Sequence, residues 1–312
     1  MKIDGNMETG RVIKSTGSWY VVELPGERRV ECRIRGKFRL EGMRTTNPVA
    51  VGDLVQVEEK EREYVIREIM PRKNYIIRKS TNLSKEAHIL AANVDQALLV
   101  ATVNHPVTST VFIDRFLAGA EAYRIPVVLV FNKTDLYGEE DRALLAEWKG
   151  IYEQVGYVCL AVSAETGEGV EEVKALLAGK VTAVAGLSGV GKSSLLNRVE
   201  PGLGLKTAVI SDAHDSGKHT TTFAEMFPLS GGGYVVDTPG VRSFGMVDME
   251  KEEISHFFPE IFACAEGCRF YNCTHTHEPG CAVRAAVEAG EISASRYASY
   301  LSMLEGDGGK YR

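Results

Sequence analysis

The sequence predicts a protein of three parts: a small β-barrel, an α/β domain on a mainly parallel sheet, and a small, mostly helical domain around a Cys/His cluster. Three observations predict this fold. Residues 1–73 alternate apolar and polar side chains in short runs, apolar runs alternate with helix-period segments from about residue 90, and four cysteines crowd into residues 264–281. We therefore place the domains at residues 1–73, 74–247 and 248–312.

The composition is that of a globular protein in water. The 312 residues are 44% hydrophobic and 25% charged. No apolar run approaches the ~20 residues that a bilayer span needs, and the N-terminus lacks the apolar stretch of a signal peptide. We expect a cytoplasmic protein with no membrane partner, and because nothing suggests an obligate oligomer we expect a monomer.

The first domain combines barrel-like strands with basic charge. Breaks rich in Gly, Pro and Asn, such as "LPGE" and "TTNPVAVGD", separate its strands. Residues 1–80 carry 17 Lys/Arg against 12 Asp/Glu, a net +5, whereas residues 81–312 carry 19 against 30, a net −11. Basic residues at alternate positions of a strand share one face of the sheet, and such a basic face could follow a phosphate backbone while aromatic residues stack bases. The alternative is a charged face that only keeps the sheet soluble. The residues concerned are Arg29, Arg33, Arg35, Lys37, Arg39, Phe38 and Trp19.

The second domain alternates buried-strand and helix patterns. β-Branched apolar runs of this kind are buried on both faces and predict right-handed βαβ units in a doubly wound sheet. The runs lie at 95–103, 126–132, 157–163 and 181–188, and the helical segments lie near 110–123, 139–155 and 169–178.

A phosphate loop follows the fourth of these runs. The stretch "GLSGVGKSS" at 186–194 fits G-x-x-x-x-G-K-[ST] between a strand and a helix. Its glycines let backbone N–H groups surround phosphates, Lys192 neutralises the β and γ oxygens, and Ser193 reaches Mg²⁺. An ordinary Gly-rich turn is the alternative, which the strand–loop–helix context disfavours. The expected phosphate-binding residues are Gly186, Ser188, Gly189, Val190, Gly191, Lys192, Ser193 and Ser194.

Two later segments are expected to sense the third phosphate. In "DTPG" (237–240), Asp237 ends a strand and can hold Mg²⁺ through water, and Gly240 can offer its N–H to the γ-phosphate. The triplet "TTT" at 220–222 offers three Mg²⁺ ligands that the sequence does not separate, of which we take Thr222. Val241 stands where many GTPases orient water with Gln. His219 is the candidate catalytic substitute, and a solvated loop histidine is the alternative.

The base-reading residues come from two other strand ends. Asn132, Lys133 and Asp135 belong to "NKTD" (132–135), and Ser163 and Ala164 begin "SAETG". A carboxylate at Asp135 can accept from the guanine N1–H and the exocyclic amine, which adenine does not offer in that arrangement. The backbone near Ala164 can donate to the guanine O6. This pattern predicts GTP rather than ATP.

The order of these motifs is reversed relative to an ordinary GTPase, because the base-reading loops precede the phosphate loop. Strand ends of an open α/β sheet meet in space whatever their order along the chain, so the site survives. The sequence therefore predicts a circular permutation, in which "DTPG" leads directly into the Cys/His domain and a movement of residues 237–248 would pull on it.

The cysteine cluster predicts a structural metal site. The spacing Cys268-x₄-Cys273-x-His275-x₅-Cys281 supplies three thiolates and one imidazole, a set that suits tetrahedral Zn²⁺ closed to substrate. His277 and Cys264 could each replace one member, and buried free thiols are the other alternative.

Together the motifs resemble those of the circularly permuted GTPases of the RsgA type, bacterial factors in small-ribosomal-subunit maturation. The resemblance rests on the basic barrel, "NKTD", "SAETG", "GLSGVGKSS", "GKHTTT", "DTPGVRSF" and the zinc pattern, and it covers nearly the whole chain. It implies an OB-fold first domain that contacts 16S rRNA, hydrolysis of GTP to GDP stimulated by the 30S subunit, release upon hydrolysis, and His219 in the role of the missing Gln.

Three alternatives remain open at this point. One is a permuted GTPase that acts on the large subunit or another RNA. Another is a nucleotide-switched adaptor that binds a protein partner through the zinc domain, and the third is an ATP-dependent kinase. The basic barrel and the Cys/His module count against the first of these, and the net charge of the barrel segment, +5, counts against the second.

Overall fold

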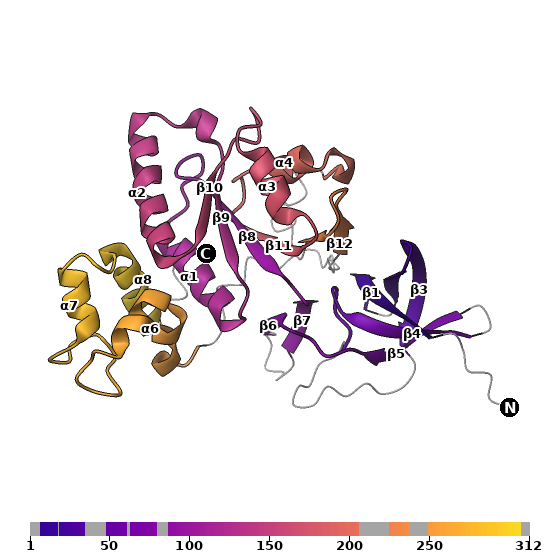
Figure 1. The fold of residues 1–312 in the computed structure, drawn as a ribbon, viewed down its shortest axis with the longest axis horizontal. Coiled ribbons are helices and arrows are strands. Elements are labelled where there is room, and N and C mark those ends of the chain that lie inside the picture. Colours follow the sequence, from indigo (N-terminus) through magenta and orange to yellow (C-terminus); the bar gives the residue numbers. More distant parts are fainter. Residues whose placement is uncertain are drawn as a thin grey trace, which may run out of the picture.

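The computed structural model describes residues 7–17, 19–34, 48–60, 63–79, 87–205, 225–237 and 249–306. Figure 1 shows three parts in a row, with an α/β body between a barrel that holds the N-terminal strands and a group of C-terminal helices. The predicted fold class is confirmed in this arrangement. None of the described helices has both the length and the apolar character needed to cross a membrane.

The N-terminal part is a closed five-stranded barrel. Its strands are β1 (Met7–Ser15), β2 (Tyr20–Leu24), β3 (Arg28–Ile34), β4 (Leu54–Lys60) and β5 (Glu63–Ile69). The strands pair in the order β1-β2-β3-β5-β4, and β4 closes the barrel against β1. Alternate side chains point inward, as the period-two pattern predicts. With Val49, which precedes β4, they form a core of Val12, Tyr20, Val22, Leu24, Val30, Cys32, Val55, Val57 and Ile66.

The body is built on parallel strands. They are β8 (Gln96–Ala101), β9 (Val127–Phe131), β10 (Val158–Ala161), β11 (Val181–Ala185) and β13 (Tyr234–Asp237), with β12 (Glu225–Pro228) antiparallel to β13. The order is β10-β9-β8-β11-β13-β12. Every residue of the central strand β8 is buried, because helices cover both faces of the sheet.

Successive side chains of β8 enter two separate cores. Leu99 packs with α1 (Thr110–Ala122) and α2 (Glu139–Val155) on one face. Leu98 packs with α3 (Val170–Leu177) and α4 (Lys192–Val199) on the other. A 3₁₀ turn, η1 (Thr134–Leu136), follows β9, and another, η2 (Pro201–Leu203), follows α4. This packing fixes the loops that leave the carboxyl ends of the strands.

The barrel and the body share one continuous eleven-stranded sheet, because β12 pairs with β1. The pairing joins Lys14 to Glu225, whose side chains also form an ion pair of 3.1 Å. The Tyr234 hydroxyl donates to Glu23 of the barrel. A two-stranded hairpin of β6 (Tyr75–Lys79) and β7 (Ala87–Ala92) lies between the two parts.

The C-terminal part is helical and packs against α1. It contains η4 (Lys251–Phe257), α6 (Pro259–Ala265), α7 (Ala282–Glu288) and α8 (Ala294–Leu304). Figure 1 shows these helices beside α1 and the lower end of α2. Ala118 of α1 belongs to the same apolar cluster as Phe258, Val283 and Tyr300, so the body completes the core of this part.

Candidate functional site

The predicted nucleotide motifs converge at one edge of the sheet. Asn132 directly follows β9, Ser163 lies two residues after β10, and Gly186 directly follows β11. Because these strands are parallel and adjacent through β8, their carboxyl ends meet at the same edge. The order of the strands along the chain therefore does not affect the geometry of the edge.

The phosphate loop has the backbone shape that an anion site needs. Gly186, Gly189 and Gly191 have φ angles of +140°, +81° and +90°, which favour glycine. A Cβ on Gly186 would lie 2.2 Å from the Val100 carbonyl oxygen. Within the described part of the chain, the backbone N–H groups of residues 188–191 donate to no acceptor. These donors at the start of a helix suit phosphate oxygens.

Lys192 and Ser193 begin α4 and are both buried. The Lys192 ammonium donates to the carbonyl oxygens of Gly186 and Leu187, at 2.9 and 2.6 Å. The Lys192 amine is thus folded onto the carbonyl groups of its own loop.

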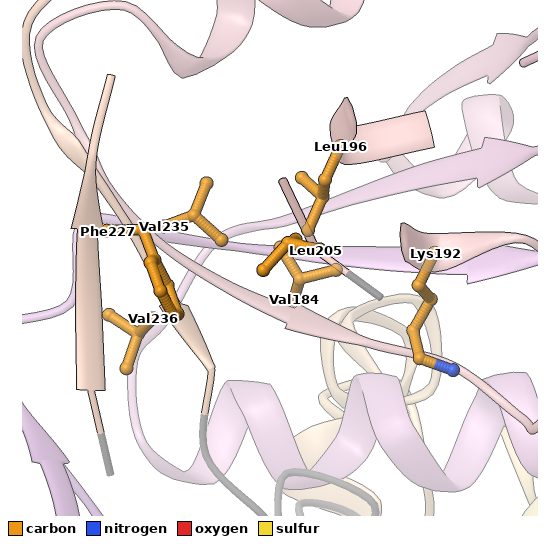
Figure 2. Close-up of a pocket in the computed structure, with 7 residues that line it drawn as sticks. All are labelled: Val184, Lys192, Leu196, Leu205, Phe227, Val235 and Val236. Carbon is orange, nitrogen blue, oxygen red and sulfur yellow. The ribbon is translucent and has the colours of Figure 1, made fainter. Parts of the chain in front are cut away.

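An apolar pocket lies behind Lys192, between α4 and the β11, β12 and β13 strands. It holds about 290 Å³ of empty space, open solvent included, and Lys192 lies at one edge with Phe227 at the opposite edge (Figure 2). Its other lining residues are Val184, Leu196, Leu205, Val235 and Val236. Because six of the seven lining residues are apolar, this pocket does not fit a phosphate.

Asn132 ties three loops of the site together and is 1% exposed. Its Nδ2 donates to the Val190 carbonyl oxygen at 2.8 Å, and its Oδ1 accepts from the Ala164 N–H at 3.1 Å. Gly191 permits this approach, since a Cβ there would lie 2.4 Å from the Asn132 Nδ2. The second Nδ2–H of Asn132 has no acceptor among the described residues, which leaves one donor for a ligand.

Asp135, three residues after Asn132, is exposed to solvent. The Ser163 hydroxyl donates to its Oδ1 at 2.5 Å and orients the group. Lys133 has a left-handed backbone with φ +69°, and its ammonium donates to the His105 carbonyl oxygen at 2.6 Å. The three predicted base-reading residues of "NKTD" therefore have distinct environments. Asn132 is buried, Lys133 contacts the loop after β8, and Asp135 is open to solvent.

The Ala164 N–H, expected to donate to the guanine O6, donates to Asn132 in this structure. The following N–H, of Glu165, has no acceptor among the described residues. A carbonyl oxygen placed over this turn could accept from either group. The expectation for Ala164 stays a prediction.

Several predicted site residues cannot be placed. Thr222, the other members of the 220–222 triplet, His219 and Gly240 lie outside the described residues. Asp237 is described only as the last residue of β13, in antiparallel register with Glu225.

Two supporting residues have no motif of their own. The Thr134 hydroxyl donates to Glu168 at 3.0 Å, which joins the "NKTD" turn to the "SAETG" loop. The Tyr137 hydroxyl contacts both Val103 and Asn132. Motifs did not predict Glu168 or Tyr137, because an isolated Glu or Tyr near a loop carries no spacing signal. Only their position within five residues of a predicted motif pointed to them.

The four predicted metal ligands form a cluster in the C-terminal part. The ligand atoms of Cys268, Cys273, His275 and Cys281 all lie within 4.8 Å of one another. The His275 Nδ1 lies 3.5 Å from the Cys268 sulfur and 3.6 Å from the Cys281 sulfur, and these two sulfurs are 3.9 Å apart. This cluster could hold one metal ion. The alternatives Cys264 and His277 are not part of it.

The surroundings of the cluster favour the ligand forms of His275 and Cys268, whereas burial raises the pKa of the Cys273 thiol to about 12. Burial lowers the pKa of His275, so the imidazole is neutral at neutral pH. Burial alone would raise the pKa of the Cys268 thiol, but the Val283 and Ala282 N–H groups at the start of α7 lower it. The Tyr297 hydroxyl donates to the His275 carbonyl oxygen at 2.6 Å and holds the left-handed backbone there. A preformed set of ligands is expected to bind a cation with little rearrangement.

The barrel carries part of the predicted basic face. The Arg33 guanidinium lies over the Trp19 ring, 3.9 Å from its centroid. Trp19 is 40% exposed, so the stacked pair faces solvent. Arg29 also lies on the exposed face of β3, where it pairs with Glu23 at 3.1 Å. Residues 35–39 lie outside the described residues.

The fold and the site define the class: a P-loop GTPase domain in circularly permuted order, preceded by a barrel and followed by a Cys₃His cluster. A sequence model of the RsgA GTPase matches residues 69–247, and one of the RsgA N-terminal domain matches residues 9–65. The chain belongs to the RsgA family of GTPases.

Relatives match over nearly the full length. "Small ribosomal subunit biogenesis GTPase RsgA" of Bacteroides fragilis (strain YCH46) is 59% identical over 305 residues, covering 97% of this chain and 98% of that protein. The protein of the same name from Porphyromonas gingivalis (strain ATCC 33277) is 56% identical over 302 residues, covering 95% and 96%.

Two solved structures share the fold. YjeQ from Thermotoga maritima matches with a TM-score of 0.81 and 40% identity, over 98% of this chain and 100% of that one. YloQ, described as a circularly permuted GTPase, matches with a TM-score of 0.76 and 31% identity, over 98% and 96%.

Proposed function

We propose that this protein binds GTP at the edge formed by β8, β9, β10 and β11 and hydrolyses it on the small ribosomal subunit during subunit maturation. The exposed Asp135 carboxylate, held by Ser163, is the observation that supports guanine as the base. The small subunit as partner follows from the names of the relatives, which are small ribosomal subunit biogenesis GTPases.

The base is bound by residues from two loops. Asp135 accepts from the guanine N1–H and amine, and Ser163 keeps the carboxylate in place. The second Nδ2–H of Asn132 is available to a ring nitrogen. The N–H groups of the turn at Ala164 and Glu165 donate to O6. Adenine would leave the Asp135 carboxylate without a donor, and this cost separates the two bases.

The phosphates are bound by the loop at 186–194. The N–H groups of residues 188–191 surround the phosphate oxygens, and Lys192 leaves its loop carbonyls to pair with the β and γ oxygens. Ser193 and Thr222 are the proposed ligands of Mg²⁺, which supplies neutralisation of charge on the transferred phosphoryl group when bound. Asp237 and Gly240 are the proposed γ-phosphate sensors, and His219 is proposed to orient the attacking water.

The C-terminal cluster is proposed to hold one structural Zn²⁺. Tetrahedral bonds of about 2.3 Å to sulfur and 2.0–2.1 Å to nitrogen place the ligand atoms about 3.5–3.8 Å apart. The separations of 3.5, 3.6 and 3.9 Å among Cys268, His275 and Cys281 fit this geometry. Four protein ligands close the site to substrate, so its role is to stabilise the C-terminal part.

The barrel is proposed to contact 16S rRNA. The solvent-facing pair of Arg33 and Trp19 offers a charge for phosphate and a ring for stacking. A protein with this role acts in the cytoplasm, where small subunits mature, and we propose that it works there as a monomer bound to GTP or GDP.

The base assignment is tested by Asp135→Asn. An amide in place of the carboxylate can donate to the O2 of xanthine but repels the guanine amine, so preference should move from GTP to xanthosine triphosphate by on the order of 100-fold or more. The measurement is the dissociation constant of GDP and XDP by calorimetry. Asp141→Asn, at a half-buried position in the first turn of α2, is the matched control and should keep the GDP preference. Unchanged GDP preference in Asp135→Asn would overturn the proposed site.

A further inference from the structure

The Tyr137 hydroxyl lies between strands β8 and β9 at their carboxyl ends, next to the proposed nucleotide site. The ladder between β8 and β9 pairs Ala101 with Phe131, and the Asn132 N–H still donates to the Ala101 carbonyl oxygen at 2.9 Å. In a parallel ladder the next bond would run from the Val103 N–H to the Asn132 carbonyl oxygen. Instead, the Tyr137 hydroxyl accepts from the Val103 N–H at 2.8 Å and donates to the Asn132 carbonyl oxygen at 2.7 Å.

The Tyr137 side chain is fixed in the core of the body. It is 5% exposed and belongs to the apolar cluster that contains Val103, Leu145 and Trp148. Burial raises the pKa of Tyr137 to about 12, so the hydroxyl stays protonated and can donate and accept at once. The Tyr137 N–H donates to the Thr134 carbonyl oxygen at 3.3 Å, which closes the turn that carries Asp135. The hydroxyl and the Asp135 carboxylate are therefore held in a fixed relation.

Each strand end that the hydroxyl separates leads to a wall of the site. On the β8 side, the loop after Val103 contains His105, whose carbonyl oxygen accepts from Lys133. The same loop contains Pro106, which lies against the phosphate loop, since a Cβ on Gly189 would lie 3.6 Å from its Cδ. On the β9 side, Asn132 holds the phosphate loop and the "SAETG" loop through its amide.

We propose that Tyr137 is a positioning residue for guanine recognition. Its hydroxyl bridges the Val103 N–H and the Asn132 carbonyl oxygen and so prevents a direct bond between them. The resulting separation of the two strand ends determines the positions of Asn132, Lys133 and Asp135. The inference rests on the proposed guanine site. Without the hydroxyl, the Val103 N–H and the Asn132 carbonyl oxygen are either left unpaired or bond to each other. The second outcome extends the ladder by one bond and moves the "NKTD" turn toward β8.

The test is Tyr137→Phe, which removes one oxygen atom and keeps the ring. The dissociation constants of GDP and IDP are measured by calorimetry on the same sample; inosine lacks the exocyclic amine, so it gives one hydrogen bond fewer to Asp135. Loss of two hydrogen bonds at the turn should weaken GDP binding about 5- to 20-fold and lower the IDP/GDP ratio of dissociation constants by about threefold or more. The KM for GTP in the presence of 30S subunits should rise, with kcat within about twofold.

The IDP/GDP ratio answers the question even if the variant is less stable. Only folded chains bind, so a fraction of unfolded protein changes both titrations equally and leaves the ratio unchanged. Tyr157→Phe is the matched control, because its hydroxyl donates to Glu121 at 3.1 Å, on α1 and away from the nucleotide edge. Tyr157→Phe should keep the wild-type dissociation constants for both GDP and IDP.

Two outcomes separate this inference from the proposed site. If Asp135→Asn changes the ratio and Tyr137→Phe keeps the wild-type GDP affinity and ratio, the positioning role of Tyr137 is wrong and the site stands. If Asp135→Asn also keeps the wild-type ratio, the proposed base reader itself is wrong, and the inference falls with it.

Discussion

The guanidinium of Arg296, on α8, donates to the Asp114 carboxylate, on α1, at 2.9 Å, and the two side chains are 1% and 0% exposed. Arg296 also makes two bonds of 2.7 and 2.9 Å to Glu260 of α6. The Tyr152 hydroxyl donates to Asp114 at 3.0 Å. A buried charge network therefore joins the C-terminal helices to the body through α1. This helix follows the loop that contains His105, the residue whose carbonyl oxygen accepts from Lys133.

Removing the cation of this network should be strongly destabilising. Arg296→Met leaves the buried Asp114 carboxylate without its charge partner, and we expect a loss of about 3–5 kcal/mol in the free energy of unfolding. Asp114→Asn keeps the shape and leaves Arg296 paired with Glu260, so its cost should be smaller, about 1–3 kcal/mol. Urea denaturation followed by tryptophan fluorescence and circular dichroism measures both.

The control for these two variants is Arg115, which follows Asp114 on α1. Arg115 donates to the Ser302 hydroxyl at 3.2 Å and has no part in the buried network, so Arg115→Met should cost less than about 1 kcal/mol. Equal losses for Arg296→Met and Arg115→Met would contradict a network that joins the two parts.

The metal cluster gives a prediction of stoichiometry. Protein purified without chelator should release about one zinc ion per chain when its thiols are modified, as read by a colorimetric zinc indicator. Cys268→Ser should lower this content and the melting temperature together, because the C-terminal core contains the ligands Cys268 and Cys281. Cys264→Ser changes a thiol outside the cluster and should keep the zinc. Loss of zinc from both variants alike would require a different ligand set.

Asp95 at the joint between the hairpin and the body gives a prediction of pH dependence. Burial would raise its pKa, but the bonds from the Lys73 ammonium and the Val181 N–H, the latter 2.7 Å long, lower it. A lowered pKa means that the ionised group stabilises the fold above the pKa of the unfolded state, about 3.9, and loses this effect as pH falls through the folded value. The melting temperature of Asp95→Asn should lie below wild type by a constant amount from about pH 5 to 8, and the two should converge below about pH 4. A difference that grows on acidification would contradict the assigned shift.

Arg33 gives a prediction for RNA binding by the barrel. Arg33→Ala should weaken binding to 30S subunits at low salt about 3- to 10-fold and reduce the slope of log affinity against log salt by about one. Arg67→Ala is the matched control on the same barrel, since the Arg67 guanidinium is already paired with Glu58. Filter binding at several salt concentrations measures both. An unchanged slope for Arg33→Ala would remove this residue from the RNA-binding face.

Periodicity predicted the body well because its elements are governed by local patterns. The predicted helices at 110–123 and 139–155 correspond to α1 (Thr110–Ala122) and α2 (Glu139–Val155). The phosphate loop, "NKTD" and the Cys/His spacing also carry their chemistry in short stretches. The four residues of the cluster that could hold a metal ion were therefore predicted without knowledge of the fold.

Contacts between distant segments were beyond such patterns. The pairing of Lys14 with Glu225 joins strands 211 residues apart and links the barrel to β12, which follows the segment that contains Thr222. The sequence suggested only the C-terminal part as the recipient of a movement near "DTPG". The Tyr137 hydroxyl was missed for a similar reason, because its two partners lie 34 and 5 residues away and share no motif with it.

The central claim, GTP hydrolysis on the small ribosomal subunit, is tested most directly by the rate of GTP turnover of the purified protein alone, with 30S subunits and with 50S subunits, at fixed Mg²⁺ and salt. The account predicts a low rate alone, a rise of at least about tenfold with 30S subunits, and no comparable rise with 50S subunits. Equal rates in all three samples, or stimulation by 50S subunits alone, would contradict it.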